Sequence, residues 1–180
     1  ALAMPYPFRT MDVRRLAFCS LMEEVYGNRI KDYYIGIHRE ELPEDPRILA
    51  FQEDEDRESG MYLPEEDFFG KGELAAQLFA ERKIDATAVV AFNDEFALGM
   101  CKRFHALGIQ VPRDISLIGI DGSSARKYRD PCLTSVGLFP EKQGARCVDT
   151  LLDMLEGKKV KYVSGSPIKL IKGDSVRKLE

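Results

Sequence analysis

The chain has 180 residues, of which 44% are hydrophobic and 31% carry a charge. This composition is typical of a folded globular protein, and it excludes a disordered or collagen-like chain. No apolar run approaches the roughly 18 residues that a membrane-spanning helix requires. Residues 1–7 lack the basic and apolar regions of a signal peptide. We therefore expect a cytoplasmic protein that has no membrane partner.

The charges are nearly balanced, because 26 Lys and Arg residues against 30 Asp and Glu residues give a formal net charge of -4. A DNA-binding domain usually concentrates positive charge to neutralise phosphates. No segment of this sequence does so, and any contact with DNA is expected to come from another part of the protein.

The four cysteines predict neither a zinc site nor a disulfide scaffold, because no two of them are in a CxxC spacing. Reduced thiols in a cytosolic protein are the simpler interpretation. Cys101 and His105 lie four residues apart and share a face of a predicted helix, but two ligands do not make a metal site. We expect no metal and no other cofactor.

The first third of the chain has the weaker pattern of secondary structure. A basic pair followed by a short apolar run predicts a strand over residues 14–19, and apolar residues near helical spacing predict a helix over residues 23–41. Pro43 and Pro46 end that helix. Residues 52–58 are acidic and without apolar periodicity, and they are expected to form an exposed loop.

From residue 64 onward, buried strands alternate with amphipathic helices. Helices are predicted over residues 64–83, 95–107 and 141–155. Strands are predicted over residues 86–92, 115–120, 133–138 and 166–171. This alternation predicts an α/β fold, in which a parallel sheet has helices on both faces.

Polar residues follow two of these strands at the point where ligands bind in such sheets, outside the carboxyl ends. Asn93 and Asp94 follow residues 86–92, and Asp121 ends the next strand. An amide both donates and accepts, and a carboxylate accepts hydroxyl hydrogen bonds, which suits a sugar or similar polyol. In the alternative interpretation, Asn93 turns the chain and Asp94 caps the following helix.

The sequence lacks the usual signatures of phosphate-binding loops, dinucleotide-binding folds and serine hydrolases. It has neither a GxxxxGK phosphate loop nor a GxGxxG after a strand, and no GxSxG elbow. Its carboxylates cannot be paired into a glycosidase-like dyad from sequence. We therefore expect a binding protein and not an enzyme.

Four segments together carry a resemblance to a known family. They are TAVVAFNDEFALG (residues 87–99), GIQVPRDISLIGIDG (108–122), DPCLTSV (130–136) and GARCVDTLLDMLEG (144–157). In this order and spacing they resemble the effector domain of the lactose/galactose-repressor family of bacterial transcription regulators. The flanking segments resemble it more loosely.

The resemblance implies a periplasmic-binding-protein-like fold of two lobes, joined by three crossing strands, with the effector between them. The crossings are expected at residues 18–20, 136–138 and near 162–166. Residues 19–136 and 163–180 would belong mainly to the carboxyl-terminal lobe, and residues 1–18 and 137–162 to the amino-terminal lobe. The family's effector domain is longer than this chain, so the chain is expected to be part of it, without the DNA-binding domain.

The resemblance also carries over the family's ligand contacts. They fall on Arg29, Asn93 or Asp94, and Asp121, with Phe68 or Phe69 where some relatives place an aromatic side chain.

Three positions depart from the family's pattern. Asp32 stands where the family usually has a glycine, three residues after the position of Arg29. Leu138 occupies a position where a polar ligand contact is common, and Gly122 one where Asp or Asn is common. These departures leave the effector's identity open and are consistent with a less polar or differently oriented ligand.

The function that follows is a sensor that works by population shift. An effector, expected to be a sugar, favours one orientation of the lobes in a homodimer and changes the operator affinity of DNA-binding heads outside this chain. One alternative is a periplasmic sugar-binding protein of a transporter. A second is an enzyme built on an α/β fold.

Overall fold

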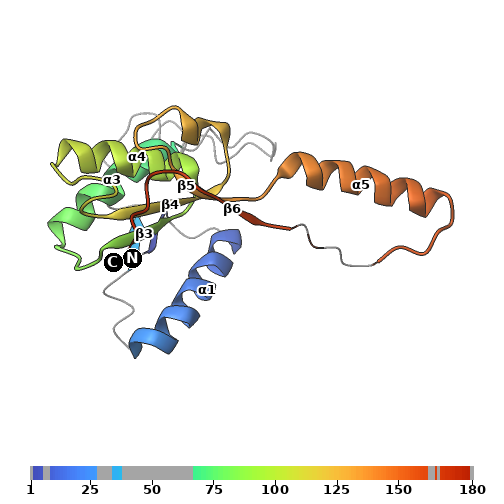
Figure 1. The fold of residues 1–180 in the computed structure, drawn as a ribbon. Helices are drawn as coiled ribbons and strands as arrows, with labels where there is room; N and C mark the ends of the chain where they lie inside the picture. Colours follow the sequence, from blue (N-terminus) through green and yellow to red (C-terminus); the bar gives the residue numbers. More distant parts are fainter. Residues whose placement is uncertain are drawn as a thin grey trace, which may run out of the picture.

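The structure is a computed structural model that describes residues 2–5, 9–27, 34–37, 67–161, 165 and 167–178. Within this part of the chain, one sheet of six strands has the order β2-β1-β3-β4-β5-β6 (Figure 1). The strands are β1 (Leu2–Pro5), β2 (Tyr34–Ile37), β3 (Ala88–Ala91), β4 (Ser116–Asp121), β5 (Thr134–Gly137) and β6 (Lys169–Ile171).

Strands β1 to β5 are parallel, and only the edge strand β6 runs antiparallel to its neighbour β5. The register pairs Val90 with Ile118 and Asp121 with Gly137. The carboxyl ends of β3, β4 and β5 therefore meet at one edge of the sheet. This arrangement confirms the predicted α/β class, with β6 as an antiparallel addition.

Helices cover both faces of the sheet, as predicted. The helices are α1 (Arg9–Tyr26), α3 (Phe68–Glu81), α4 (Asp94–Ala106) and α5 (Pro140–Leu155), with a short 3-10 helix, η3 (Ser124–Lys127). Helices α3 and α4 pack together on one face and α1 lies on the other (Figure 1). None of the described helices combines the length and apolar character that a membrane span requires.

Alternating side chains of β3 explain how both faces are covered, because successive residues of a strand point to opposite sides. Val89 is buried in the main core, where Phe96 and Phe104 of α4 are fully buried. Val90 belongs to a smaller cluster that includes Phe18 of α1. Burying a large apolar side chain contributes about 1.5–3 kcal/mol, so these contacts hold the helices on the sheet.

Two glycines let α3 and α4 approach closely. A Cβ atom at Gly72 would overlap the carbonyl oxygen of Phe96, and one at Gly99 would overlap the carbonyl oxygen of Phe69. The obstacle is backbone in both cases and cannot move aside as a side chain would. The crossing of these two helices therefore requires glycine at both positions.

The strand predicted over residues 14–19 is wrong, because α1 runs through this segment. A run of four apolar residues does not distinguish a strand from a helix. The stronger signal is the absence of Gly and Pro between Pro7 and Gly27, and the helix ends where Gly27 adopts a φ of 62°. The crossing strand expected at residues 18–20 is wrong for the same reason.

The helix predicted over residues 23–41 is also wrong beyond Tyr26, because Tyr34–Ile37 forms β2. Aromatic and β-branched residues favour a strand, and Gly36 disfavours a helix. Ile35 is fully buried, so tertiary packing reinforces that preference. Strand β1 was not predicted.

The elements predicted after residue 64 are confirmed, with boundaries shifted by a few residues. Helix α4, for example, ends before Gly108, which has a φ of 76°. The acidic segment 52–58 lies outside the described residues. The division into two lobes stays a prediction, and β1, from the segment expected in the amino-terminal lobe, pairs with β3 in this sheet.

We expect Gly99→Ala to destabilise the chain by about 1–3 kcal/mol, because α3 and α4 must separate to admit the methyl group. The control is Gly144→Ala in α5, where a Cβ meets nothing within 4 Å. Alanine favours a helix by up to about 1 kcal/mol over glycine, so the control should be neutral or stabilising. Urea denaturation of both variants measures this, and equal stabilities would contradict the tight crossing.

Candidate ligand-binding site

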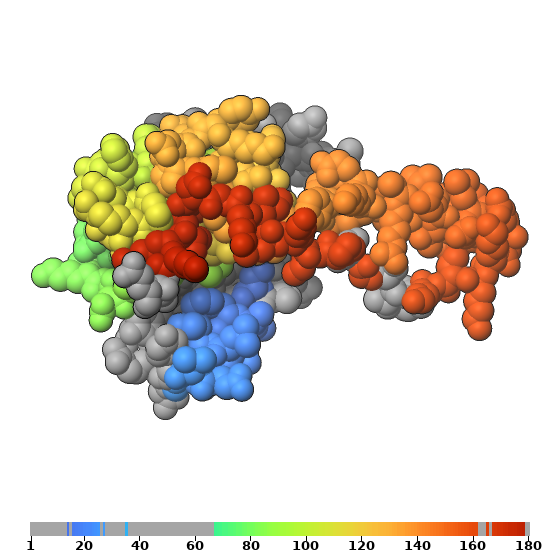
Figure 2. Space-filling model, viewed as in Figure 1, coloured from blue at the N-terminus to red at the C-terminus, as the bar shows by residue number. Residues whose placement is uncertain are grey.

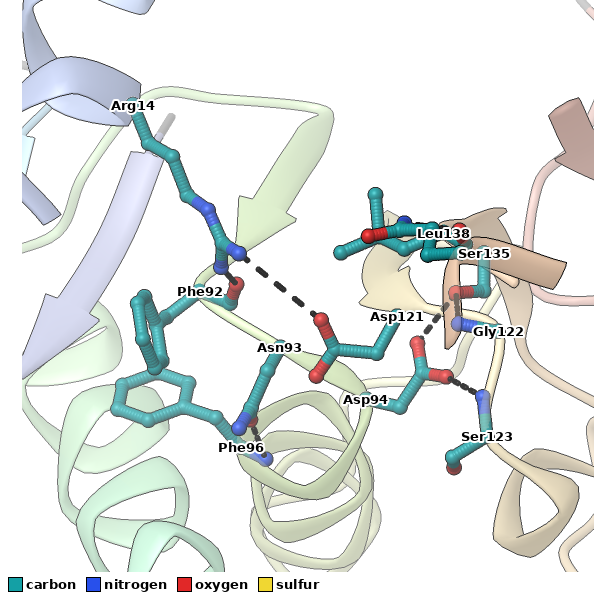
Figure 3. A network of polar contacts seen from close by, with 11 residues as sticks. Arg14, Phe92, Asn93, Asp94, Phe96, Asp121, Gly122, Ser123, Ser135 and Leu138 are labelled. Atoms are coloured by element: carbon teal, nitrogen blue, oxygen red, sulfur yellow. Dashed lines mark hydrogen bonds and ion pairs between the residues drawn. The ribbon is translucent and has the colours of Figure 1, made fainter. Parts of the chain in front are cut away.

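The carboxyl ends of β3 and β4 bring together two of the predicted ligand residues, as Figure 3 shows. Asn93 follows β3 after Phe92, and Asp121 is the last residue of β4. Both are partly exposed, and the Asp121 side chain is 43% exposed. The two side chains therefore lie at the same edge of the sheet, within reach of solvent.

Asn93 is the N-cap of α4. Its backbone is extended, and its Oδ1 accepts a hydrogen bond of 2.8 Å from the Phe96 amide. The alternative interpretation of the sequence had assigned the cap to Asp94. Since its oxygen is used by the helix, the amide NH₂ group is the part of Asn93 that remains for a ligand.

Asp94 does not face the site, because its side chain is buried at 1% exposure. One carboxylate oxygen accepts a 2.6 Å hydrogen bond from the Ser123 amide, and the other accepts from the Ser135 hydroxyl. Ser135 Oγ in turn accepts from the Gly122 amide at 3.0 Å. A Cβ at Gly119 would overlap this carboxylate, so glycine is required beneath it. Asp94 ties α4 to β5 and to the segment after β4.

Asp121 is held in an unfavourable state. Its φ of 112° is a conformation that residues other than glycine rarely adopt, and such strain clusters at functional sites. Burial raises the pKa of the Asp121 carboxyl above its ordinary value, the Arg14 guanidinium lowers it, and Asp94 raises it again. The net effect is a raised pKa. A half-buried carboxylate that is partly exposed to solvent is suited to accept hydrogen bonds from a ligand.

Arg14 of α1 is the site residue that the sequence prediction missed. Its Nη1 donates a 2.7 Å hydrogen bond to the Phe92 carbonyl, and its guanidinium lies 4.9 Å from the centre of the Phe92 ring. Its Nη2 lies 3.9 Å from Asp121 Oδ1. Phe18 lies four residues later on the same helical face and packs against the sheet, which is the signal that could have placed Arg14 here.

Phe68 borders the site from the start of α3, with its ring centre 5.4 Å from that of Phe92. Phe69, the other aromatic candidate, lies elsewhere, with Lys102 Nζ and the Arg129 guanidinium at 5.4 and 5.9 Å from its ring centre. Of the two alternatives, the structure brings Phe68 to the site.

Two further predicted positions have different outcomes. Arg29 lies outside the described residues, so its predicted contact stays a prediction. Leu138 donates its amide to the Asp121 carbonyl at 3.2 Å, and Figure 3 shows it next to Asp121. The backbones of Leu138 and Asp121 are therefore joined directly, at the position where a polar ligand contact is common in the family.

A separate groove of about 410 Å³ lies along α4 and does not include Asn93 or Asp121. Its lining includes Leu98, Cys101, His105, Arg129 and Asp130. Burial raises the pKa of the Cys101 thiol, Arg129 lowers it and Asp130 raises it, with a net increase. Among the described residues, no group of His, Cys, Asp and Glu could hold a metal ion. The groove thus lacks the exposed, activated thiol or metal ligands of a reactive centre.

Comparison with known sequences finds one family over most of the chain. The model of the periplasmic binding protein-like domain matches residues 10–176. The HTH-type transcriptional repressor PurR of Vibrio vulnificus is 34% identical over 107 residues, which are 59% of this chain and 32% of the repressor. The chain therefore spans about a third of the length of this relative.

Two solved structures that are similar to this chain are those of transcription regulators. The Lac repressor dimer bound to operator and the anti-inducer ONPF has a TM-score of 0.56 and 28% identity, over 59% of this chain and 37% of the repressor chain. A LacI family regulator from Arthrobacter sp. FB24 in complex with lactose has a TM-score of 0.64 and 20% identity, over 98% of this chain and 56% of its own. The second match shows a shared fold.

We expect Asp94→Asn to lower stability by about 1–3 kcal/mol, because an amide has one acceptor oxygen and cannot keep the hydrogen bonds from both the Ser123 amide and the Ser135 hydroxyl. The exposed Asp85 provides the control, and Asp85→Asn should change stability by less than about 0.5 kcal/mol. Chemical denaturation measures both. Wild-type stability in Asp94→Asn would show that the tie contributes little.

We expect the stability gained by Asp121→Asn to grow as the pH rises. The folded-state pKa of Asp121 is raised, so at a pH below the ordinary carboxyl pKa this side chain does not lower the free energy of unfolding of the wild type. It loses stability as the pH rises through the folded-state pKa, when a half-buried group must ionise. Urea denaturation of both chains across the acidic to neutral range measures the difference. A constant difference would contradict the raised pKa.

Proposed function

We propose, because this chain belongs to the family of periplasmic binding protein-like domains, that it is part of the small-molecule sensor of a transcription regulator of the lactose/galactose-repressor type. The observation that carries the proposal is the meeting of Asn93 and Asp121 at the carboxyl ends of adjacent parallel strands. Ligands bind at this edge in open α/β sheets. The regulators among its relatives support the same function.

The effector is proposed to be a sugar. Asp121 accepts hydroxyl hydrogen bonds, and the Asn93 amide donates one. Phe68, whose ring centre lies 5.4 Å from that of Phe92, offers an aromatic surface beside the site for the apolar face of a sugar ring. The Arthrobacter relative was solved with lactose, which makes lactose the first compound to test.

The exposed helix α5 supports a second lobe as the other half of the binding site. Figure 2 shows α5 extending away from the body of the molecule, and none of its residues is buried. Its exposed apolar side chains are Val148, Leu151, Leu152, Met154 and Leu155. Such a surface is expected to be covered in the whole protein. We propose that residues 137–162 belong to the amino-terminal lobe and residues 19–136 and 163–180 mainly to the carboxyl-terminal lobe.

Signal transmission is proposed to follow a shift between two orientations of the lobes. The effector binds between them and favours one orientation, and in a cytoplasmic homodimer this changes the spacing of DNA-binding heads. Those heads would contact the operator from a part of the protein outside this chain. The chain's own role is to bind the effector and not to catalyse a reaction.

A thermal-shift screen of sugars and nucleobases tests the proposed function, since a ligand specific for the folded state raises the melting temperature. Lactose is the first sugar in the panel. Stabilisation by a sugar supports the proposal. A panel without a single stabilising compound, or reproducible turnover of a sugar or phosphate ester that is lost in Asp121→Asn, contradicts it.

We expect Asp121→Asn to weaken binding of the stabilising compound by about 1–3 kcal/mol, roughly 5- to 150-fold in Kd, because a charged acceptor is lost. Asparagine tolerates a positive φ better than most residues, so the variant should fold. Asp85→Asn serves as the control. Calorimetric titration giving equal Kd values for wild type and Asp121→Asn would remove Asp121 from the site.

A further inference from the structure

We infer that Arg14 and Asp121 bind a single hydroxyl group of the effector between them, and that this pair selects a hydroxylated ligand. The inference rests on the proposed function, because it concerns the same site. It adds Arg14, a residue of α1, to the ligand contacts and states what chemical group this part of the site recognises.

The two charged groups lie at a distance that suits a bridging atom. Arg14 Nη2 and Asp121 Oδ1 are 3.9 Å apart and face each other (Figure 3). This is too long for a direct hydrogen bond. An oxygen atom placed about 2.8 Å from each of them would sit at the apex of a triangle with an angle of about 90°. The distance between the two atoms therefore allows one oxygen atom to contact both groups at once.

The chemistry of the pair decides which oxygen fits. Arg14 only donates hydrogen bonds, and ionised Asp121 only accepts them. A hydroxyl oxygen accepts from Arg14 and donates its proton to Asp121. A carbonyl or carboxylate oxygen would face the aspartate without a proton, and an ammonium would face the arginine. Because the two charges cancel, the pair also gives no net attraction to an anion.

Both groups are held in position before a ligand arrives. The Arg14 guanidinium is fixed by its 2.7 Å hydrogen bond to the Phe92 carbonyl and by the Phe92 ring beneath it. Asp121 is fixed by the hydrogen bonds of the two residues that follow it, Gly122 and Ser123, to Ser135 and Asp94. A fixed gap recognises a hydroxyl with little loss of side-chain entropy.

The site also leaves room for a solute to reach the pair. The Arg14 and Asp121 side chains are 33% and 43% exposed. Asp121 also occupies a strained backbone conformation, and its ion pair with Arg14, at 3.9 Å, includes no direct hydrogen bond. A ligand hydroxyl would supply the hydrogen bond that Arg14 is too distant to make.

The test is a thermodynamic cycle between side chain and ligand group, measured by calorimetric titration of the intact chain. The probes are lactose and its monodeoxy analogues, and the variants are Arg14→Gln and Asp121→Asn. One analogue should bind the wild type about 5- to 100-fold more weakly than lactose. Each variant should bind that same analogue and lactose with nearly equal Kd values, since the shared hydroxyl no longer matters.

Arg113→Gln is the control, because Arg113 is exposed and pairs with Asp114 away from the site; it should keep the wild-type preference. Arg14→Lys keeps the positive charge and replaces Arg14→Gln if that variant fails to fold. It should lose part of the preference for lactose over the monodeoxy analogue.

The inference is overturned if Arg14→Gln keeps the wild-type ratio of the two Kd values. It is also overturned if Arg14→Gln and Asp121→Asn become insensitive to the removal of different hydroxyl groups. Lactose binding with unchanged Arg14→Gln affinity overturns this inference alone, whereas wild-type binding of no panel compound overturns the proposed function as well.

Discussion

The buried carboxylate of Asp94 is the interaction on which the candidate site depends. It accepts hydrogen bonds from Ser123 and Ser135, and it lies in the first turn of α4, where the helix dipole favours a negative charge. Asp94 directly follows Asn93, and Ser123 lies two residues after Asp121. The two hydrogen bonds therefore set the distance between Asn93 and Asp121. Hydrogen bonds to a buried charge contribute about 1.5–3 kcal/mol each, enough to hold this geometry.

Asp121, which these hydrogen bonds help to position, contributes less to the stability of the fold than Asp94 does. Asp121 has a positive φ and a raised pKa, and the nearest described cation, that of Arg14, stays 3.9 Å away. Structural residues are normally relieved of such costs, whereas binding residues retain them. The contrast between a fully paired Asp94 and an underpaired Asp121 separates the residue that builds the site from the one that faces a ligand.

The part of the site that could be predicted is the part encoded locally. An apolar strand followed by polar residues identified Asn93 and Asp121, and Gly108 located the end of α4. The contacts that were missed join distant segments: Arg14 and Phe92 are 78 residues apart, and Asp94 and Ser135 are 41 apart. The short apolar run before Cys19 did not distinguish strand from helix, so α1 and its arginine could not be placed.

The proposed function depends above all on the binding of a guest molecule at the carboxyl ends of β3 and β4. Heteronuclear NMR of the chain, titrated with the panel compound that stabilises it most, locates the binding surface directly. The largest amide shifts should occur at Phe92–Asp94 and Asp121–Ser123. Shifts confined to the groove along α4, around Cys101, His105 and Arg129, would place binding elsewhere and contradict the account.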